Sequence, residues 1–122
     1  MKLTLETSDV NLVSAWEPDA VRVGEAWLRG HLILSAQEIL LDWDVTSPEA
    51  LSAQDLQPAI NLNPKIVLLG TGSRLALPNI DLMTVLAAQG VGLEIMDTPA
   101  ACRTYNVLVH EDRDVVAALF IG

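Results

Sequence analysis

The stretch GLEIMDTPAACRTYNVL, residues 92–108, joins an apolar strand to a marked helix start. Its first part, Gly92–Met96, predicts a strand. Thr98 is then expected to be the helix N-cap, because its hydroxyl can accept a hydrogen bond from a free backbone N–H group of the first turn. Pro99 follows at the first helical position, where the missing N–H of proline costs nothing. We therefore predict a helix from Thr98 to about His110.

A second apolar strand is predicted at Ile66–Leu69, and the sharp polar turn Gly70–Arg74 follows it. An unbroken apolar run of this kind is typical of parallel strands that are buried on both faces. Between the two strands, Pro78 and Asn79 open a predicted helix that runs to Gln89. Past Asn79 this helix is apolar nearly all round, so we expect it to pack on two sides.

The order strand, helix, strand predicts how the two turns lie in space. A right-handed crossover makes the strands at 66–69 and 92–96 parallel neighbours. The loops that follow them, 70–74 and 97–99, then lie side by side at the carboxyl edge of the sheet. Ligands commonly bind at this edge of open α/β sheets, so it is the first candidate for a functional site.

The chain changes character near Thr46. Short β-favouring runs come before this residue and predict a curled antiparallel meander, with turns or bulges at Gly24 and Gly30. The runs are Leu12–Trp16, Ala20–Val23, Glu25–Leu28, His31–Leu34 and Ile39–Trp43.

After Thr46 the pattern alternates between helix and strand. Helix starts are expected at Ser47 and at Ser52, and Pro58 must shorten or kink any helix there. Val115–Ile121 is the last predicted strand. Its continuous apolar character predicts an interior strand, whose direction relative to its neighbours the sequence leaves open.

Length and composition favour one domain over residues 1–122, with a β-rich part at 1–46 and an α/β part at 47–122. Hydrophobic residues make up 51% of the chain and charged residues 19%, which is somewhat more apolar than usual. Because excess apolar surface often ends at an interface, we expect a protein partner or a homo-oligomer. The net charge of −9 argues against nucleic acid and anionic membrane surfaces, which bind clustered lysines and arginines.

The cysteine content and the first residues point to one compartment. The single cysteine, Cys102, cannot form an internal disulfide, which suits a reducing environment. The start MKLTLETSD lacks the apolar core of a signal peptide, and no apolar run is long enough for a membrane span. We therefore expect a cytoplasmic protein with no direct membrane insertion.

Several segments together resemble one family of small domains. They are Arg22–Gly24, Ile39–Val45, Leu68–Gly72 and Gly92–Leu108. This family includes a mitochondrial respiratory complex I assembly factor and many uncharacterised bacterial proteins. The resemblance implies a three-layer α/β domain, with a central mixed sheet flanked by helices and additional antiparallel strands on the N-terminal side. It implies no established reaction, and without a mitochondrial presequence the chain looks like a bacterial member.

The loops at the carboxyl edge supply the candidate ligand-binding residues. These are Gly70, Thr71, Gly72, Ser73, Arg74, Asp97, Thr98 and Arg103. Glycines after a strand let backbone N–H groups approach an anion, and a helix N-terminus carries partial positive charge. The dinucleotide and triphosphate fingerprints are incomplete, because Leu75 stands where each requires a small residue. Two alternatives stay open: a ligand pocket, or a tight glycine turn beside a helix start that Asp97 satisfies from within the chain.

Reactive side chains do not form a complete catalytic set in the sequence. Cys102 lies in the first turns of the predicted helix, but His110 is roughly 12 Å farther along it, too far to act as its base. His31 and His110 have no metal-ligand spacing. Glu94 lies within an apolar strand, either pointing outward or buried with a raised pKa. We therefore expect no catalytic residue, metal or cofactor.

Two functions remain on these grounds. The favoured one is a non-enzymatic protein-binding or assembly-factor-like module. The alternative is a small-molecule or anion-binding protein, a class that includes enzymes, which would use the loops at 70–74 and 97–103.

Overall fold

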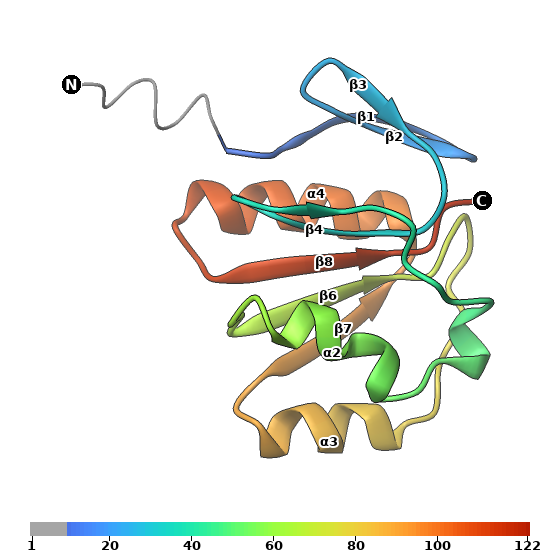
Figure 1. Ribbon diagram of the computed structural model, residues 1–122, viewed down its shortest axis with the longest axis vertical. Coiled ribbons are helices and arrows are strands. Elements are labelled where there is room, and N and C mark those ends of the chain that lie inside the picture. Colours follow the sequence, from blue (N-terminus) through green and yellow to red (C-terminus); the bar gives the residue numbers. More distant parts are fainter. Residues whose placement is uncertain (1–9) are drawn as a thin grey trace.

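The computed structural model describes residues 10–122, which form two β-sheets and three helices (Figure 1). The strands are β1 (Val13–Glu17), β2 (Ala20–Val23), β3 (Ala26–Leu28), β4 (Leu32–Ser35), β5 (Ile39–Leu40), β6 (Ile66–Gly70), β7 (Gly92–Met96) and β8 (Val115–Leu119). The helices are α2 (Gln57–Ile60), α3 (Asp81–Ala88) and α4 (Thr98–His110). The expectation about the start MKLTLETSD concerns residues outside the described ones.

The central sheet is mixed and has the strand order β5-β4-β8-β6-β7. Strands β6 and β7 are parallel neighbours as predicted, with Leu68 paired to Glu94. Strand β8 runs parallel to β6 and antiparallel to β4, which settles the direction that the sequence left open. All five residues of β8 are buried, so the prediction of an interior strand is confirmed, although the strand ends at Leu119.

Helices cover both faces of the central sheet, and a hydrophobic core lies on each side (Figure 1). Alternate side chains of β6 go to opposite cores, as the strand pleat requires. Leu68 packs with α4 residues such as Tyr105, and Val67 packs with residues of α2 and α3. The domain is therefore the α/β fold expected from the resemblance, with a mixed sheet between helices.

The first three strands form a separate antiparallel sheet, β1-β2-β3, that packs over α4. The Asn106 side chain joins this sheet to α4, because it accepts from Val13 N and donates to Val13 O at 2.9 and 2.8 Å. The hydroxyl of Tyr105 donates to Asn11 O at 2.7 Å. These three bonds hold β1 and the residues just before it against α4.

The predicted N-terminal antiparallel meander is confirmed for β1, β2 and β3, but it does not extend to the later runs. The five runs divide between the two sheets, since β4 leaves the first three strands and pairs with β8. The run Ile39–Trp43 was also predicted too long, because β5 ends at Leu40. Asp42 has a positive φ of 58°, and Trp43 N donates to His31 O at 3.0 Å, so the chain bends out of the strand there.

The helix predicted from Pro78 and Asn79 begins later, at Asp81. The side chain of Asn79 accepts from Asp81 N at 2.9 Å and holds the preceding residues in a turn. The expected packing on two sides was also wrong. Leu82 and Leu86 enter the core, whereas Met83 on the other side of α3 is 44% exposed.

The helix start predicted at Ser52 is present, with two reciprocal hydrogen bonds between Ser52 and Asp55. Asp55 N donates to the Ser52 hydroxyl, and Ser52 N donates to the Asp55 carboxylate. As Pro58 predicts, only a short helix follows, α2 at Gln57–Ile60. The start predicted at Ser47 yields a single 3₁₀ turn, Pro48–Ala50.

Candidate functional site

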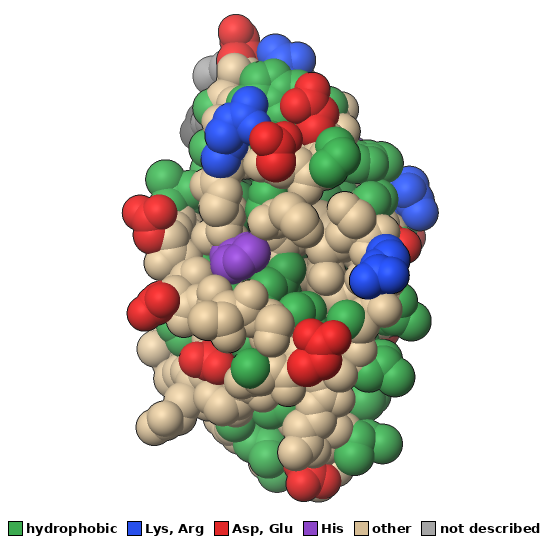
Figure 2. All heavy atoms as spheres, turned by 90° about the vertical axis from the view of Figure 1, so that its right-hand side faces the viewer, with side chains coloured by type: hydrophobic (Ala, Val, Ile, Leu, Met, Phe, Trp, Pro, Cys, Tyr) green, Lys and Arg blue, Asp and Glu red, His purple; other side chains and the backbone are tan. Residues whose placement is uncertain are grey.

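The loops after β6 and β7 lie side by side at the carboxyl edge of the sheet, as the crossover predicts. Thr98 N donates to Gly72 O at 2.8 Å, and Thr71 N donates to Met96 O at 2.9 Å. Figure 2 shows this edge of the molecule, where hydrophobic side chains surface in a central hollow among acidic and basic groups. The segment after β8 reaches the same edge.

The buried hydroxyl of Thr98 joins three segments at this edge. It accepts from Gly72 N at 2.8 Å and donates to Phe120 O at 2.7 Å. Gly70 makes this approach possible, because a Cβ there would lie 2.8 Å from Leu119 Cδ2 and 2.9 Å from Thr98 Oγ1. Gly70 and Thr98, both candidate ligand-binding residues, thus fasten the loops to one another.

The N-cap of α4 is Asp97, so the prediction of Thr98 was wrong. The Asp97 carboxylate accepts from Ala100 N at 2.9 Å, and Asp97 O accepts from Ala101 N. Thr98 N is bonded to Gly72 O, and Pro99 has no N–H. The N–H groups of residues 98–101 are thus either bonded within the chain or absent, which leaves little at this helix end for an anion.

Thr71 forms hydrogen bonds within the loop, and Arg74 points to a different part of the surface. The Thr71 hydroxyl donates to Arg74 O at 2.7 Å and accepts from Ala76 N at 3.1 Å, which closes the loop on itself. The exposed Arg74 borders a separate hollow beside Glu49. Arg103 instead lies over the ring of Trp16, with its guanidinium carbon 5.7 Å from the ring centroid. The two arginines therefore flank different parts of the edge.

A cavity of about 290 Å³ opens between these loops and the β1–β2 hairpin. We call it the carboxyl-edge cavity. It is lined by Trp16, Glu17, Pro18, Gly72, Ser73, Thr98, Pro99, Phe120, Ile121 and Gly122. Three of the predicted site residues, Gly72, Ser73 and Thr98, are among them. The apolar walls formed by Trp16, Pro18 and Phe120 were not predicted from the sequence, because no local pattern shows that the hairpin and the segment after β8 lie next to these loops.

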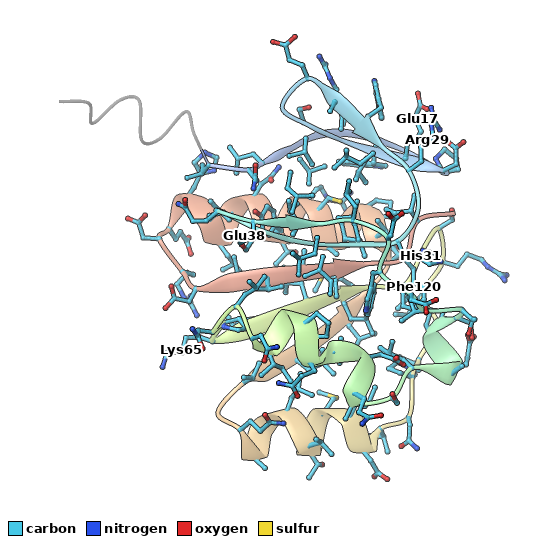
Figure 3. The ribbon with its side chains drawn as sticks, in the orientation of Figure 1. Glu17, Arg29, His31, Glu38, Lys65 and Phe120 are labelled. Carbon is cyan, nitrogen blue, oxygen red and sulfur yellow. The ribbon has the colours of Figure 1, made fainter. Side chains whose placement is uncertain are left out.

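His31 supports the wall formed by residues 120–122. Its Nδ1 accepts from Ile121 N at 3.0 Å, and its ring lies 4.9 Å from the ring of Phe120 (Figure 3). Trp43 packs against the same Phe120 at 5.2 Å. Burial lowers the pKa of His31 below its usual value of 6.5, which favours the neutral ring that can accept this hydrogen bond.

Cys102 is buried in the core between α4 and the central sheet and does not line the cavity. Burial raises the pKa of its thiol to about 12, and the charge of Arg103 only partly opposes this rise. The thiol is thus protonated near neutral pH and a poor nucleophile. Glu94 is exposed on β7. Over residues 10–122, no group of three or more side chains is placed to hold a metal ion.

Within the described range, no helix is both long and apolar enough to cross a bilayer.

Comparison with known proteins identifies relatives over nearly all of this fold. A family model described as "Protein of unknown function (DUF498/DUF598)" matches residues 13–120. A "13 kDa major membrane protein" of Francisella tularensis is 35% identical over 85 residues, which cover 69% of each chain. The Danio rerio NADH dehydrogenase (ubiquinone) 1 alpha subcomplex assembly factor 3 is 37% identical over 82 residues, 66% of this chain but 47% of that protein.

A solved structure has the same fold over almost its whole length. The crystal structure of a Bordetella parapertussis protein superimposes with a TM-score of 0.86 at 36% identity, covering 93% of this chain and 97% of the other. The chain spans 47% of the length of the zebrafish assembly factor, so the match to that protein concerns one part of it.

Proposed function

The chain belongs to the DUF498/DUF598 family, and from this we propose that it is a non-enzymatic protein-binding module of the assembly-factor kind. Relatives named as NADH dehydrogenase (ubiquinone) assembly factors support a role in bringing other proteins together. The observation that carries the proposal is the carboxyl-edge cavity, whose walls are mostly apolar.

The cavity suits an apolar side chain of a partner better than a charged group. Its volume of about 290 Å³ lies just below the usual range for small-molecule pockets, roughly 300–1,000 Å³. Trp16, Pro18, Pro99 and Phe120 give it apolar walls. Thr98, the buried polar residue among its lining, already has both of its hydrogen bonds within the chain. A partner therefore gains most by burying apolar surface here.

The chemistry of the nearby reactive groups supports a binding role. The Cys102 thiol is buried and protonated, and the Nδ1 of His31 is occupied by the bond from Ile121 N. Neither side chain is therefore available as an activated nucleophile or a free base at this edge.

Affinity purification with matched tryptophan variants tests the proposal. Tagged wild-type protein, Trp16→Ala and Trp27→Ala are used to recover partners from the native host, with quantification by mass spectrometry. Trp16 lines the cavity and is 39% exposed, whereas Trp27 is 41% exposed and lies outside it. We expect specific partners that are lost with Trp16→Ala and kept with Trp27→Ala. Recovery of no specific partner, or equal recovery with both variants, contradicts the proposal.

A second candidate is a small ligand held by the loops at 70–74 and 97–103. It is favoured by the position of Gly72, Ser73 and Thr98 on the cavity wall and of Arg103 over Trp16 at its rim. Thermal melting of wild type and Arg103→Glu against a panel of metabolites tests it. A ligand-induced rise in melting temperature that Arg103→Glu abolishes without unfolding supports this candidate, and the absence of any such rise rejects it.

We place this function in the cytoplasm, because a chain whose single cysteine is a buried free thiol needs no oxidising compartment. The name of the Francisella relative points instead to a membrane. Fractionation of host cells decides between them, since recovery in the membrane fraction after a high-salt wash contradicts the cytoplasmic assignment.

A further inference from the structure

The wall of the carboxyl-edge cavity that follows β8 is firmly fixed at its first residue, Phe120. Phe120 N donates to Gly70 O at 2.8 Å, and Phe120 O accepts from the Thr98 hydroxyl at 2.7 Å. The buried ring of Phe120 packs against Trp43. Amide, hydroxyl and indole groups do not titrate near neutral pH, so the position of this residue does not depend on pH there.

The next residue of this wall is held by a group that does titrate. Ile121 N donates to Nδ1 of His31 at 3.0 Å, and the His31 ring lies 4.9 Å from the ring of Phe120 (Figure 3). His31 lies between β3 and β4, so this bond joins parts of the chain that are 90 residues apart. The position of Ile121 and Gly122 on the cavity wall thus depends in part on one imidazole nitrogen.

The bond from Ile121 exists only while the His31 ring is neutral. A neutral imidazole has one N–H and one accepting nitrogen, so Nδ1 accepts here when the proton is on Nε2. In the protonated ring both nitrogens are donors, and the Ile121 N–H would face another N–H. Histidine is the side chain whose ordinary pKa places this change between pH 5 and 8. Acid therefore breaks the bond to Ile121 but leaves both bonds of Phe120 in place.

The charged groups around His31 do not hold its ring in one protonation state. Among residues 10–122 the ion pair is that of Arg29 with Asp19, at 2.9 Å, and it does not include the ring. Burial is the cause that lowers the pKa of His31 below 6.5. The charged side chains of the β1–β2 hairpin, of the segment that carries His31 and of the segment around Trp43 are exposed to solvent; they are Glu17, Asp19, Arg29, Asp42 and Asp44.

We propose that His31 is an acid-sensitive latch for the carboxyl-edge cavity, which holds the wall at residues 121–122 while its ring is neutral and releases it when the ring is protonated. The hinge of this movement lies between Phe120, which stays bonded, and Ile121. The latch is a property of the chain alone and goes beyond the proposed function. Its consequence for binding, a weaker hold on an occupant of the cavity as the pH falls, rests on that function.

NMR of the purified, isotope-labelled chain tests the latch without a partner. The ring carbon shifts of His31 follow its protonation, and amide hydrogen exchange, corrected for the intrinsic rate at each pH, follows Ile121 and Phe120. We expect the protection of the Ile121 amide to fall at least about tenfold as His31 is protonated, while that of Phe120 stays unchanged. The indole resonance of Trp16, which lines the cavity, should shift with the same midpoint, whereas that of Trp27, outside it, should not.

Two glutamine variants separate the latch from general effects of acid. The side-chain oxygen of His31→Gln can accept from Ile121 N at every pH, so the Ile121 amide should stay protected throughout. His110→Gln is the matched control, because it removes the other histidine of the chain, which is exposed and contacts Asn106 O within α4. We expect His110→Gln to behave like the wild type.

The proposal is overturned if the Ile121 amide stays protected while His31 titrates, or if the Trp16 resonance does not follow this titration. It is also overturned if Ile121 and Phe120 lose protection together, because the whole edge then unfolds, or if His31→Gln keeps the pH dependence. The wild-type measurements decide even where His31→Gln does not fold. Because none of these samples contains a partner, the latch can fail while the proposed function stands, and the reverse.

Discussion

Replacing Thr98 by valine tests whether its hydroxyl holds the carboxyl edge together. Valine has nearly the same shape, but it can neither accept from Gly72 N nor donate to Phe120 O, the two partners at 2.8 and 2.7 Å. Both bonds are buried, so water cannot easily replace the hydroxyl.

The expected loss of stability follows from the two groups left behind. A buried N–H or C=O without a partner costs about 1–3 kcal/mol. Thr98→Val leaves one of each, so the free energy of unfolding should fall by roughly 2–6 kcal/mol. This is a large part of the total, which is about 5–15 kcal/mol for a domain of ordinary stability.

Urea unfolding of wild type, Thr98→Val and Thr98→Ser measures this effect. Serine keeps the hydroxyl and loses one methyl group, which costs about 1 kcal/mol. We expect the unfolding midpoint of Thr98→Val to lie well below that of Thr98→Ser, with an unchanged slope. If Thr98→Val is as stable as Thr98→Ser, the hydroxyl does not join the loops and this account of the edge is wrong.

Three further predictions concern other residues. Gly70→Ala should lower the free energy of unfolding by about 1–3 kcal/mol, because the added Cβ would lie 2.8 Å from Leu119 Cδ2. Gly92→Ala is the control, since its Cβ would lie 3.7 Å from the nearest atom, Lys65 O, and should cost little. Urea unfolding of both variants measures the difference. Because burial lowers the pKa of His31 in the folded state, the neutral ring favours folding. This contribution to the free energy of unfolding is fully present above about pH 6.5 and is lost as the pH falls through the lower pKa of the folded state. Urea midpoints between pH 5 and 8 should therefore fall more steeply toward acid in wild type than in His31→Gln, and equal slopes would contradict this. Cys102, with a thiol pKa of about 12, should react with a thiol reagent at least about tenfold faster in denaturant than in the folded protein, as absorbance after mixing will show.

The parts of the fold that follow from short-range rules were predictable from the sequence. The strand at Gly92–Met96 and the helix after it depend on apolar runs and on Pro99, whose dihedral preference acts locally. The parallel pairing of β6 and β7 follows from the handedness of a crossover, which is nearly invariant. These rules need no knowledge of distant residues.

The features that were not predicted depend on contacts between residues far apart in the sequence. Asp97 and Thr98 can both cap a helix. Asp97 is the N-cap of α4, because the Thr98 hydroxyl donates to Phe120 O, 22 residues away. The place of β4 beside β8 likewise depends on residues separated by most of the chain. No local pattern encodes either pairing.

The candidate site was predictable in part for the same reason. Gly72, Ser73 and Thr98 lie on loops whose adjacency follows from the crossover, and they line the carboxyl-edge cavity. Trp16 and Phe120 reach it only through the packing of the hairpin and of the segment after β8. For α3, the apolar pattern was identified correctly, but a pattern cannot tell a covered face from one left exposed.

The central place of β8 also has a consequence for how the chain folds during synthesis. Strand β8 lies between β4 and β6, and these two are not neighbours without it. A nascent chain that has emerged from the ribosome only as far as α4 therefore has two additional unpaired strand edges, on β4 and on β6, which β8 covers in the complete fold. Because exposed strand edges favour aggregation, we expect such a chain to depend on chaperones until residues 115–119 emerge and close the sheet.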